Sequence, residues 1–162
     1  ETNAYESDWS EMASMFLASG VIRNVLNELE VYADSTGMLV KVKSGRGYVK
    51  GHVFRSTEEE TLAIAAADAT NPRIDRVIMR VSWIGGGLSN VDLAVLTGTP
   101  AASPVAPALT QNTSIWEEEL AQVAVAAAAV TIAAGNVSDH RTMVTPASSG
   151  GAADVLTVQY FS

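Results

Sequence analysis

The chain has 162 residues, no cysteine, two histidines and a net charge of -8, and 48% of its residues are hydrophobic. The lack of cysteine excludes a disulfide-stapled scaffold and a thiolate metal site. Ten Lys and Arg against eighteen Asp and Glu argue against a nucleic-acid groove binder. No apolar run approaches the ~20 residues that cross a bilayer. We therefore expect an ordered domain that binds neither nucleic acid nor a membrane.

Alanine and valine dominate the apolar residues, whereas the chain has only three Phe, three Trp and four Tyr. Because β-branched valine suits a pleated, half-buried surface, this composition predicts thin β layers around a modest core. We expect a mainly β fold: an antiparallel β-sandwich-like domain over residues 21–144. A segment with a short amphipathic helix precedes it (residues 1–20), and a Gly/Ser/Ala linker with a terminal strand follows it (residues 145–162).

The N-terminal segment has the signature of a helix start. Asp8 stands three residues before Glu11, which is the spacing of a capping box. Trp9, Met12 and Phe16 then fall on one helical face. This apolar face needs a partner, which is either the domain's own sheet or another subunit.

From residue 29 onward the hydrophobic pattern alternates with a period of two, as in strands. It predicts strands at residues 29–33, 38–43, 48–54, 61–65, 73–83 and 91–96. Residues 44–47 are predicted to form a turn or bulge. The glycines Gly45, Gly47 and Gly51 indicate strained turn geometry or close backbone approach.

The clearest strand is 73–83. Arg76 and Arg80 lie on one face of it, and alternate apolar residues lie on the other: Val77, Met79, Val81 and Trp83. Three prolines between residues 98 and 109 favour an extended, irregular crossing.

Residues 115–125 allow two readings. Their alanines permit a helix, but Val123 and Val125 favour a strand. Strict alternation in that strand would place Glu117 and Glu119 on the same face as Ala121 and the two valines.

The C-terminal stretch 154–161 reads as an isolated strand. An isolated strand needs a sheet edge to pair with, its own or a neighbour's. We expect subunit or partner contacts at this strand and at the N-terminal helix, through Trp9, Met12, Phe16, Val155, Leu156, Val158, Tyr160 and Phe161.

No set of residues resembles a catalytic or metal centre. His52 and His140 are the only histidines, and no Gly-x-Ser-x-Gly pattern accompanies them. The acidic runs 58–60 and 117–119 lack the alternating spacing and bend glycine of calcium loops. We expect no catalytic residue, no cofactor and no metal site, and we expect that the chain is not an enzyme.

Two charged motifs are more informative about structure. Arg73, Asp75 and Arg76 form one motif, and Asp139 and Arg141 flank His140 in the other. Each places a carboxylate beside a guanidinium, whose fork can donate two hydrogen bonds to it. They either pair with each other across strands or are unrelated surface charges.

The order of these features is similar to a known family. The series comprises Gly20-Val21, residues 37–42, residues 45–51, residues 72–80, Gly98-Thr99-Pro100 with Pro104 and Pro107, residues 120–125 and residues 136–141. It resembles the β-rich N-terminal domain of tailed-bacteriophage baseplate and tail-fibre proteins of the upper baseplate type. The resemblance covers about residues 16–145.

The resemblance implies a virion structural protein, made in the host bacterial cytoplasm and located in the tail or baseplate. It implies a homo-oligomer, with a trimer favoured, that also binds other virion proteins. Only a linker and one strand follow Arg141, which favours an adaptor or hub over a receptor-binding protein. The alternatives are a capsid head fibre or decoration protein, and a host-glycan-binding module that would use Tyr48, Trp83, Trp116 and Tyr160.

Overall fold

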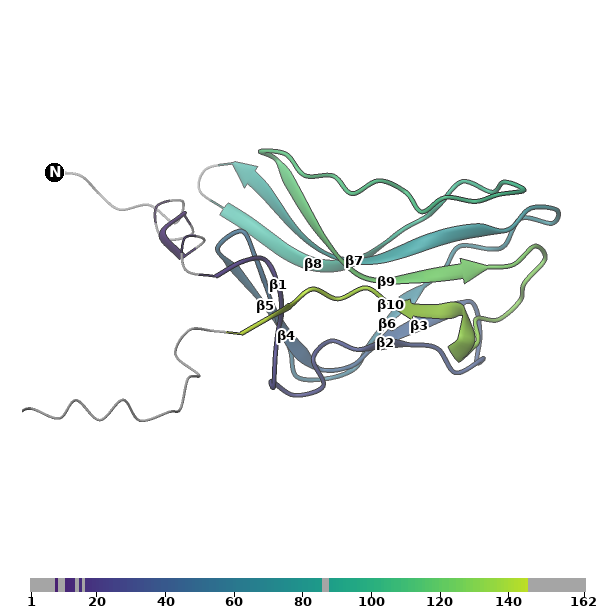
Figure 1. Cartoon of the computed structure of the whole chain (residues 1–162), viewed down its shortest axis with the longest axis horizontal. Coiled ribbons are helices and arrows are strands. Elements are labelled where there is room, and N and C mark those ends of the chain that lie inside the picture. The colour runs from purple at the N-terminus through teal and green to yellow at the C-terminus, as the bar shows by residue number, and fades with distance from the viewer. Residues whose placement is uncertain (1–7, 9–10, 14, 16, 86–87, 146–162) are drawn as a thin grey trace, which may run out of the picture.

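The computed structural model describes residues 8, 11–13, 15, 17–85 and 88–145, and it is mainly β with several antiparallel sheets (Figure 1). The elements are β1 (Gly20–Ile22), β2 (Val31–Tyr32), β3 (Leu39–Val42), β4 (Gly45–Val49), β5 (His52–Ser56), β6 (Glu60–Ala63), β7 (Arg73–Gly85), β8 (Leu88–Leu96), β9 (Ile115–Val125), the 3-10 helix η1 (Ala134–Asn136), β10 (Val137–Asp139) and β11 (Met143–Val144).

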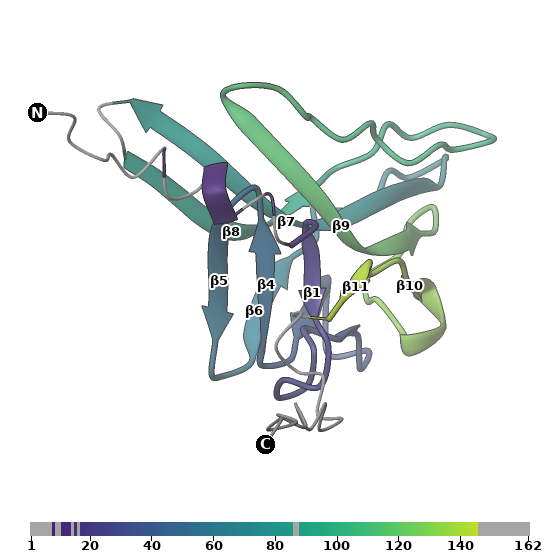
Figure 2. The same cartoon turned by 60° about the vertical axis from the view of Figure 1, so that its left-hand side comes forward.

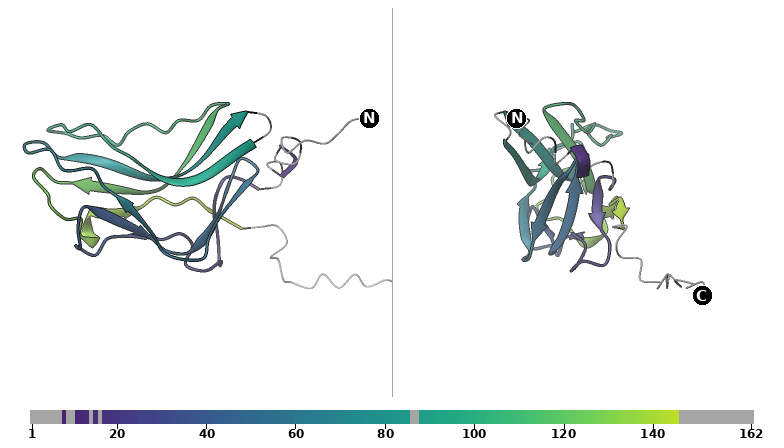
Figure 3. Two further views of the ribbon diagram at one scale, coloured as in Figure 1. Left: turned by 180° about the vertical axis from the view of Figure 1, so that it is seen from behind. Right: turned by 90° about the vertical axis from the view of Figure 1, so that its left-hand side faces the viewer.

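The strands form three sheets. We call them the β7 sheet (order β10-β9-β7-β8), the β1 sheet (order β11-β1-β4-β5) and the β3 sheet (order β2-β3-β6). All pairs are antiparallel except the parallel pair of β1 with β11. The β7 sheet forms one layer, and the other two sheets face it from the opposite side of the core (Figures 1 and 3).

Valine is the commonest residue in the core between these layers. Nine of the nineteen buried hydrophobic residues are valines, and the only aromatic residues among them are Tyr48 and Phe54. Residues from all three sheets share one cluster, for example Val21 of β1, Val40 of β3 and Val77 of β7. The prediction of a mainly β fold with antiparallel sheets is therefore confirmed.

Most predicted strands are confirmed. The strands expected at 29–33, 38–43, 61–65, 73–83, 91–96 and 115–125 overlap β2, β3, β6, β7, β8 and β9. Residues 98–109 contain no strand or helix, as their prolines predicted. The helical alternative for residues 115–125 is wrong, because β9 pairs along its whole length with β7.

The single strand predicted at 48–54 is wrong, and so is the turn at 44–47. The chain instead reverses at Lys50 and Gly51, whose φ angles of 45° and 86° are both positive. Two positive φ angles are the mark of the two-residue hairpin turn that matches strand twist. The hairpin pairs β4 with β5 in register from Gly45 opposite Ser56 to Val49 opposite His52.

The glycines of β4 permit the close approach that the sequence predicted. A Cβ at Gly45 would collide with the backbone nitrogen of Leu29, and a Cβ at Gly47 would collide with the thioether of Met79. The two residues are therefore strand positions with no room for a side chain, which explains why they read as a turn in the sequence.

A β-bulge in β9 overturns the predicted faces of that strand. The register with β7 shifts between Val77 and Ile78, which lie opposite Ala121 and Glu119, so that Leu120 is the extra residue. The alternation restarts at this bulge. Glu119 consequently falls on the face away from the core, whereas Ala121 is buried in it.

The structure does not support the predicted N-terminal helix and does not test the predicted C-terminal strand. The expected N-terminal helix is not among the elements, which begin with β1, and Trp9 and Phe16 lie outside the described residues. A single apolar stripe stabilises so short a helix only when it packs on a partner. The predicted strand 154–161 also lies outside the described residues. None of the helices in the described ranges is long and apolar enough to cross a membrane.

Candidate interaction surfaces

The first charged motif forms a buried ion pair. Arg73 and Asp75 alternate along β7, so their side chains share one face, and they are 3% and 0% exposed. Arg73 Nε donates to Asp75 Oδ1 (2.9 Å), and its Nη2 donates to Oδ2 (3.2 Å). The guanidinium also donates to the carbonyls of Ala65 and Ala66, and the amide of Gly98 donates to Asp75 Oδ1 (2.8 Å). The pair thus joins β7 to the segments after β6 and β8.

Arg76, the third member of this motif, faces away from the core. Its Nε lies 3.3 Å from Glu119 Oε1, and Nδ1 of His140 lies 3.7 Å from the other carboxylate oxygen of Glu119. Further along the same face, Arg80 Nη2 lies 2.9 Å from Asp92 Oδ2. The outer face of the β7 sheet thus carries a row of ion pairs. The bulge in β9 contributes to it by placing Glu119 on this face.

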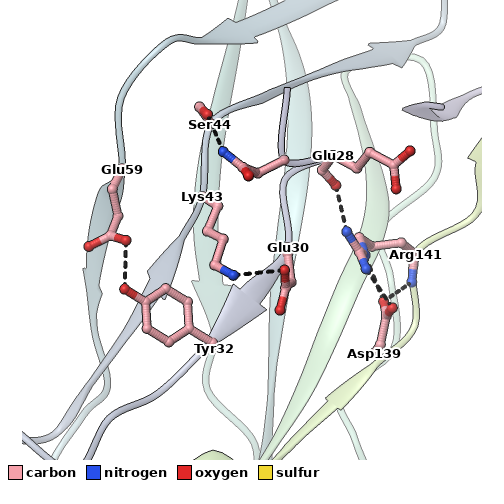
Figure 4. Close-up of polar contacts among 9 residues, drawn as sticks. Glu28, Glu30, Tyr32, Lys43, Ser44, Glu59, Asp139 and Arg141 are labelled. Atoms are coloured by element: carbon pink, nitrogen blue, oxygen red, sulfur yellow. Dashed lines mark hydrogen bonds and ion pairs between the residues drawn. The ribbon is translucent and has the colours of Figure 1, made fainter. Parts of the chain in front are cut away.

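The second charged motif holds a strained loop. Arg141 donates to both oxygens of Asp139 (2.8 and 2.7 Å) and, through Nη1, to the carbonyl oxygen of Glu28 (2.7 Å) (Figure 4). These hydrogen bonds lower the pKa of Asp139 and raise that of Arg141. Glu28 belongs to residues 24–29, four of which have positive φ angles between 52° and 61° although none is glycine.

The two motifs do not pair with each other. Asp75 is satisfied by Arg73, and Asp139 is satisfied by Arg141. The sequence correctly placed each carboxylate beside a guanidinium, but the partners are the neighbours within each motif.

A second set of paired charges covers the exposed face of the β3 sheet, and no sequence motif indicated it. Lys41 Nζ lies 2.8 Å from Asp34 Oδ2 and 3.9 Å from Glu59 Oε1, and the hydroxyl of Tyr32 donates to Glu59 (2.6 Å). Lys43 Nζ lies 2.9 Å from Glu30 Oε2 (Figure 4). The hydrogen bond from Lys41, together with that from Thr36, lowers the pKa of Asp34 to about 2.

The outer face of the β1 sheet has the opposite character. Arg46 of β4 lies directly opposite Arg55 of β5, and both are exposed. Neither forms an ion pair with any carboxylate in the described ranges. We call these two residues the basic patch. Figure 2 shows β1, β4 and β5 side by side in front of the other sheets.

The end of the molecule where the β4–β5 and β7–β8 hairpins meet exposes large apolar side chains. Val53 is 59% exposed, Ile84 71% and Leu88 65%. We call these three residues the apolar end. The rings of His52 and Trp83 pack edge to face with centroids 6.0 Å apart, which joins the two hairpins.

The aromatic residues considered for glycan binding do not form an exposed platform. Tyr48 is only 5% exposed, and its hydroxyl has no hydrogen-bond partner among the described residues. Trp83 and Trp116 are partly buried against the core, and Lys50 Nζ lies 3.8 Å from the centroid of the Trp116 ring. Tyr160 lies outside the described residues.

The residues predicted for contacts are mostly beyond what the structure describes. Met12 is described and is 45% exposed, whereas Trp9, Phe16 and the five residues of the terminal strand are not described. His52 and His140 have different neighbours, Trp83 and Glu119 respectively. Within the described ranges, no group of three or more His, Asp or Glu side chains is placed to hold a metal ion.

Comparisons with protein-family models, with curated proteins and with solved structures find no match to this chain.

Proposed function

We propose that this chain is a structural assembly module of a bacteriophage virion, acting in the tail tip or baseplate as an adaptor for fibres or receptor-binding proteins. Its sandwich-like β domain would pack against further copies of itself, with a trimer favoured, and against other virion proteins. The proposal assigns it no catalytic activity.

The apolar end supports this proposal most directly. Val53, Ile84 and Leu88 are each more than half exposed, and they come from two hairpins that contact each other. Large apolar side chains that stay exposed in a folded chain are candidates for a site where another protein binds. Two hairpins packed on the shared core present these side chains on a preformed surface, as an assembly contact requires.

The long edge strand β8 supports the same role. It has nine residues and, within the described part of the chain, it pairs only with β7. No strand in the described ranges pairs with its second edge, which we propose as a binding site for a strand of another chain. The apolar end and the edge of β8 would thus be two separate places where neighbouring proteins bind.

A pair of double variants tests the role of the apolar end. Ile84→Asp with Leu88→Asp places charges at this end, whereas Val105→Asp with Val130→Asp makes the same change at two valines that are each 79% exposed elsewhere. We expect the first variant to lose self-association in light scattering and incorporation into particles, and the second to keep both. Equal assembly by the two variants would refute the proposed contact.

Electron microscopy of intact particles tests the location. Antibody labelling of the chain at the tail tip or baseplate would support the proposal. Labelling of the capsid would favour the head fibre or decoration alternative, and absence from particles would overturn the virion role.

A further inference from the structure

The positively charged side chains fall into two groups, those with a carboxylate partner and those without one among the described residues. Six of its ten Lys and Arg form ion pairs with carboxylates: Lys41, Lys43, Arg73, Arg76, Arg80 and Arg141. The other four have no such pair among the described residues, and all four belong to the β1 sheet or its turns: Arg23, Arg46, Lys50 and Arg55. In a chain of net charge -8, the cations without carboxylate partners are thus collected on one sheet.

The basic patch lies at the centre of this group. Arg46 and Arg55 are register partners, and like charges directly opposite each other on adjacent strands destabilise a sheet. Nothing in the described part of the chain offsets this repulsion with a carboxylate. An anionic group bound from outside would turn the repulsion into two charge-assisted contacts.

Val53 adds an exposed apolar side chain to the patch. It lies two residues from Arg55 on β5, so its side chain is on the same face, and it is 59% exposed, whereas its register partner Tyr48 is only 5% exposed. The fitting ligand is consequently a segment that carries carboxylates and an apolar side chain close together, rather than a simple anion.

The chain itself contains such a segment. Residues 1–11 include the carboxylates of Glu1 and Glu6, with Tyr5 between them, and the first positively charged side chain in the sequence is Arg23. Ser19, eight residues after this segment, accepts a hydrogen bond at its Oγ from the amide of Lys50, so the described chain before β1 lies beside the β4–β5 turn.

We propose that the basic patch binds the acidic N-terminal segment, residues 1–11, of a second copy of this chain. The inference rests on the proposed function as an assembly module and names the contact between copies. The patch and the segment are different surfaces, so the contact is heterologous and repeats from copy to copy until a ring closes. Because the contact is largely electrostatic and exposed, it weakens as salt screens the charges.

Sedimentation equilibrium of full-length variants tests the contact. Arg46→Gln with Arg55→Gln is expected to weaken self-association about tenfold, as the loss of two exposed charge contacts predicts. Ala102→Glu with Ser103→Glu is the matched control, because it lowers the net charge by the same two units at exposed positions outside the β1 sheet. The control is expected to self-associate like the unmodified chain, and an equal effect of both variants would overturn the proposal.

A charge exchange then separates binding between copies from binding within one copy. Arg46→Glu with Arg55→Glu reverses the patch, and Glu1→Lys with Glu6→Lys reverses the segment. Each variant alone is expected to dissociate, and an equimolar mixture of the two is expected to reassociate, because each patch then meets a complementary segment on the other variant. Failure of the mixture to reassociate, or an unaffected segment variant, overturns the proposal.

The outcome also distinguishes this inference from the proposed function. If the patch variants self-associate normally while the apolar-end variant dissociates, the assembly role holds and the inference fails. If the unmodified chain is monomeric at every concentration tested and absent from particles, both fail.

Discussion

The β3 sheet and the β1 sheet lie in the same layer, yet their positively charged side chains differ in whether they have carboxylate partners. On the β3 sheet, Lys41 and Lys43 each meet a carboxylate supplied by a neighbouring segment. On the β1 sheet, the hairpin sets Arg46 against Arg55. The first arrangement pairs every cation with a carboxylate, whereas the second sets two like charges against each other with no carboxylate among the described residues. The difference separates charges paired within the fold from the charges that we propose as a binding site.

The largest effect on stability is expected at the buried ion pair of Arg73 and Asp75. Asp75→Ala leaves the Arg73 guanidinium buried without its carboxylate and the Gly98 amide without its acceptor. We expect the free energy of unfolding in urea to fall by about 3–5 kcal/mol. Asp92→Ala is the control, because its half-exposed pair with Arg80 is expected to contribute about 1 kcal/mol or less. A smaller loss for Asp75→Ala than for Asp92→Ala would contradict this assignment.

Arg141 is the next test, because it serves both a carboxylate and a backbone carbonyl. Arg141→Met removes its hydrogen bonds to Asp139 and Glu28 and is expected to cost about 1–3 kcal/mol of unfolding free energy. Amide exchange at Asn27 and Leu29, which donate to the carbonyl of Ser44, is expected to accelerate. Unchanged exchange at these two amides would show that the loop keeps its positive φ angles without Arg141.

Acid titration tests the exposed network of the β3 sheet. The folded pKa of Asp34 is about 2, below its ordinary value of 3.8, chiefly because Lys41 donates a hydrogen bond to it. A depressed folded pKa contributes stability that is complete above about pH 4 and is lost as the pH falls towards 2. We expect Lys41→Met to raise the pKa of Asp34 and to flatten this part of the stability profile. An NMR titration that finds Asp34 near 3.8 in the unmodified chain would remove the basis of this prediction.

The smallest effect is expected at the two arginines that form no ion pair within the described residues. Arg46→Gln with Arg55→Gln removes a like-charge repulsion, so we expect the unfolding free energy to change by no more than about 0.5 kcal/mol, and upwards if at all. Urea denaturation of the double variant measures it. A loss above about 1 kcal/mol would mean that these arginines stabilise the fold, and the contrast between the two sheets would disappear.

Some of these charges could be recognised in the sequence because their contacts are local. Arg73 and Asp75 are two residues apart on a strand, and so are Asp139 and Arg141 around β10. The basic patch was missed because it depends on where the chain turns. Arg46 and Arg55 lie equally far from Lys50 and Gly51, so a correctly placed turn would have predicted that they face each other.

The sequence by itself determined the mainly β class, the valine-rich core and most strand positions. These follow from β-branched composition and a period of two, which each segment carries alone. Only the tertiary structure decided the hairpin at Lys50, the bulge at Leu120 and the partners of Lys41 and Arg76. The glycines of β4 suggest a turn in the sequence, but in the fold they are strand residues whose missing side chains leave room for Leu29 and Met79. Glu119 lies on the outer face because the bulge adds one residue to β9 relative to β7. Register between distant strands is a property of the packed chain, because it depends on which surfaces meet.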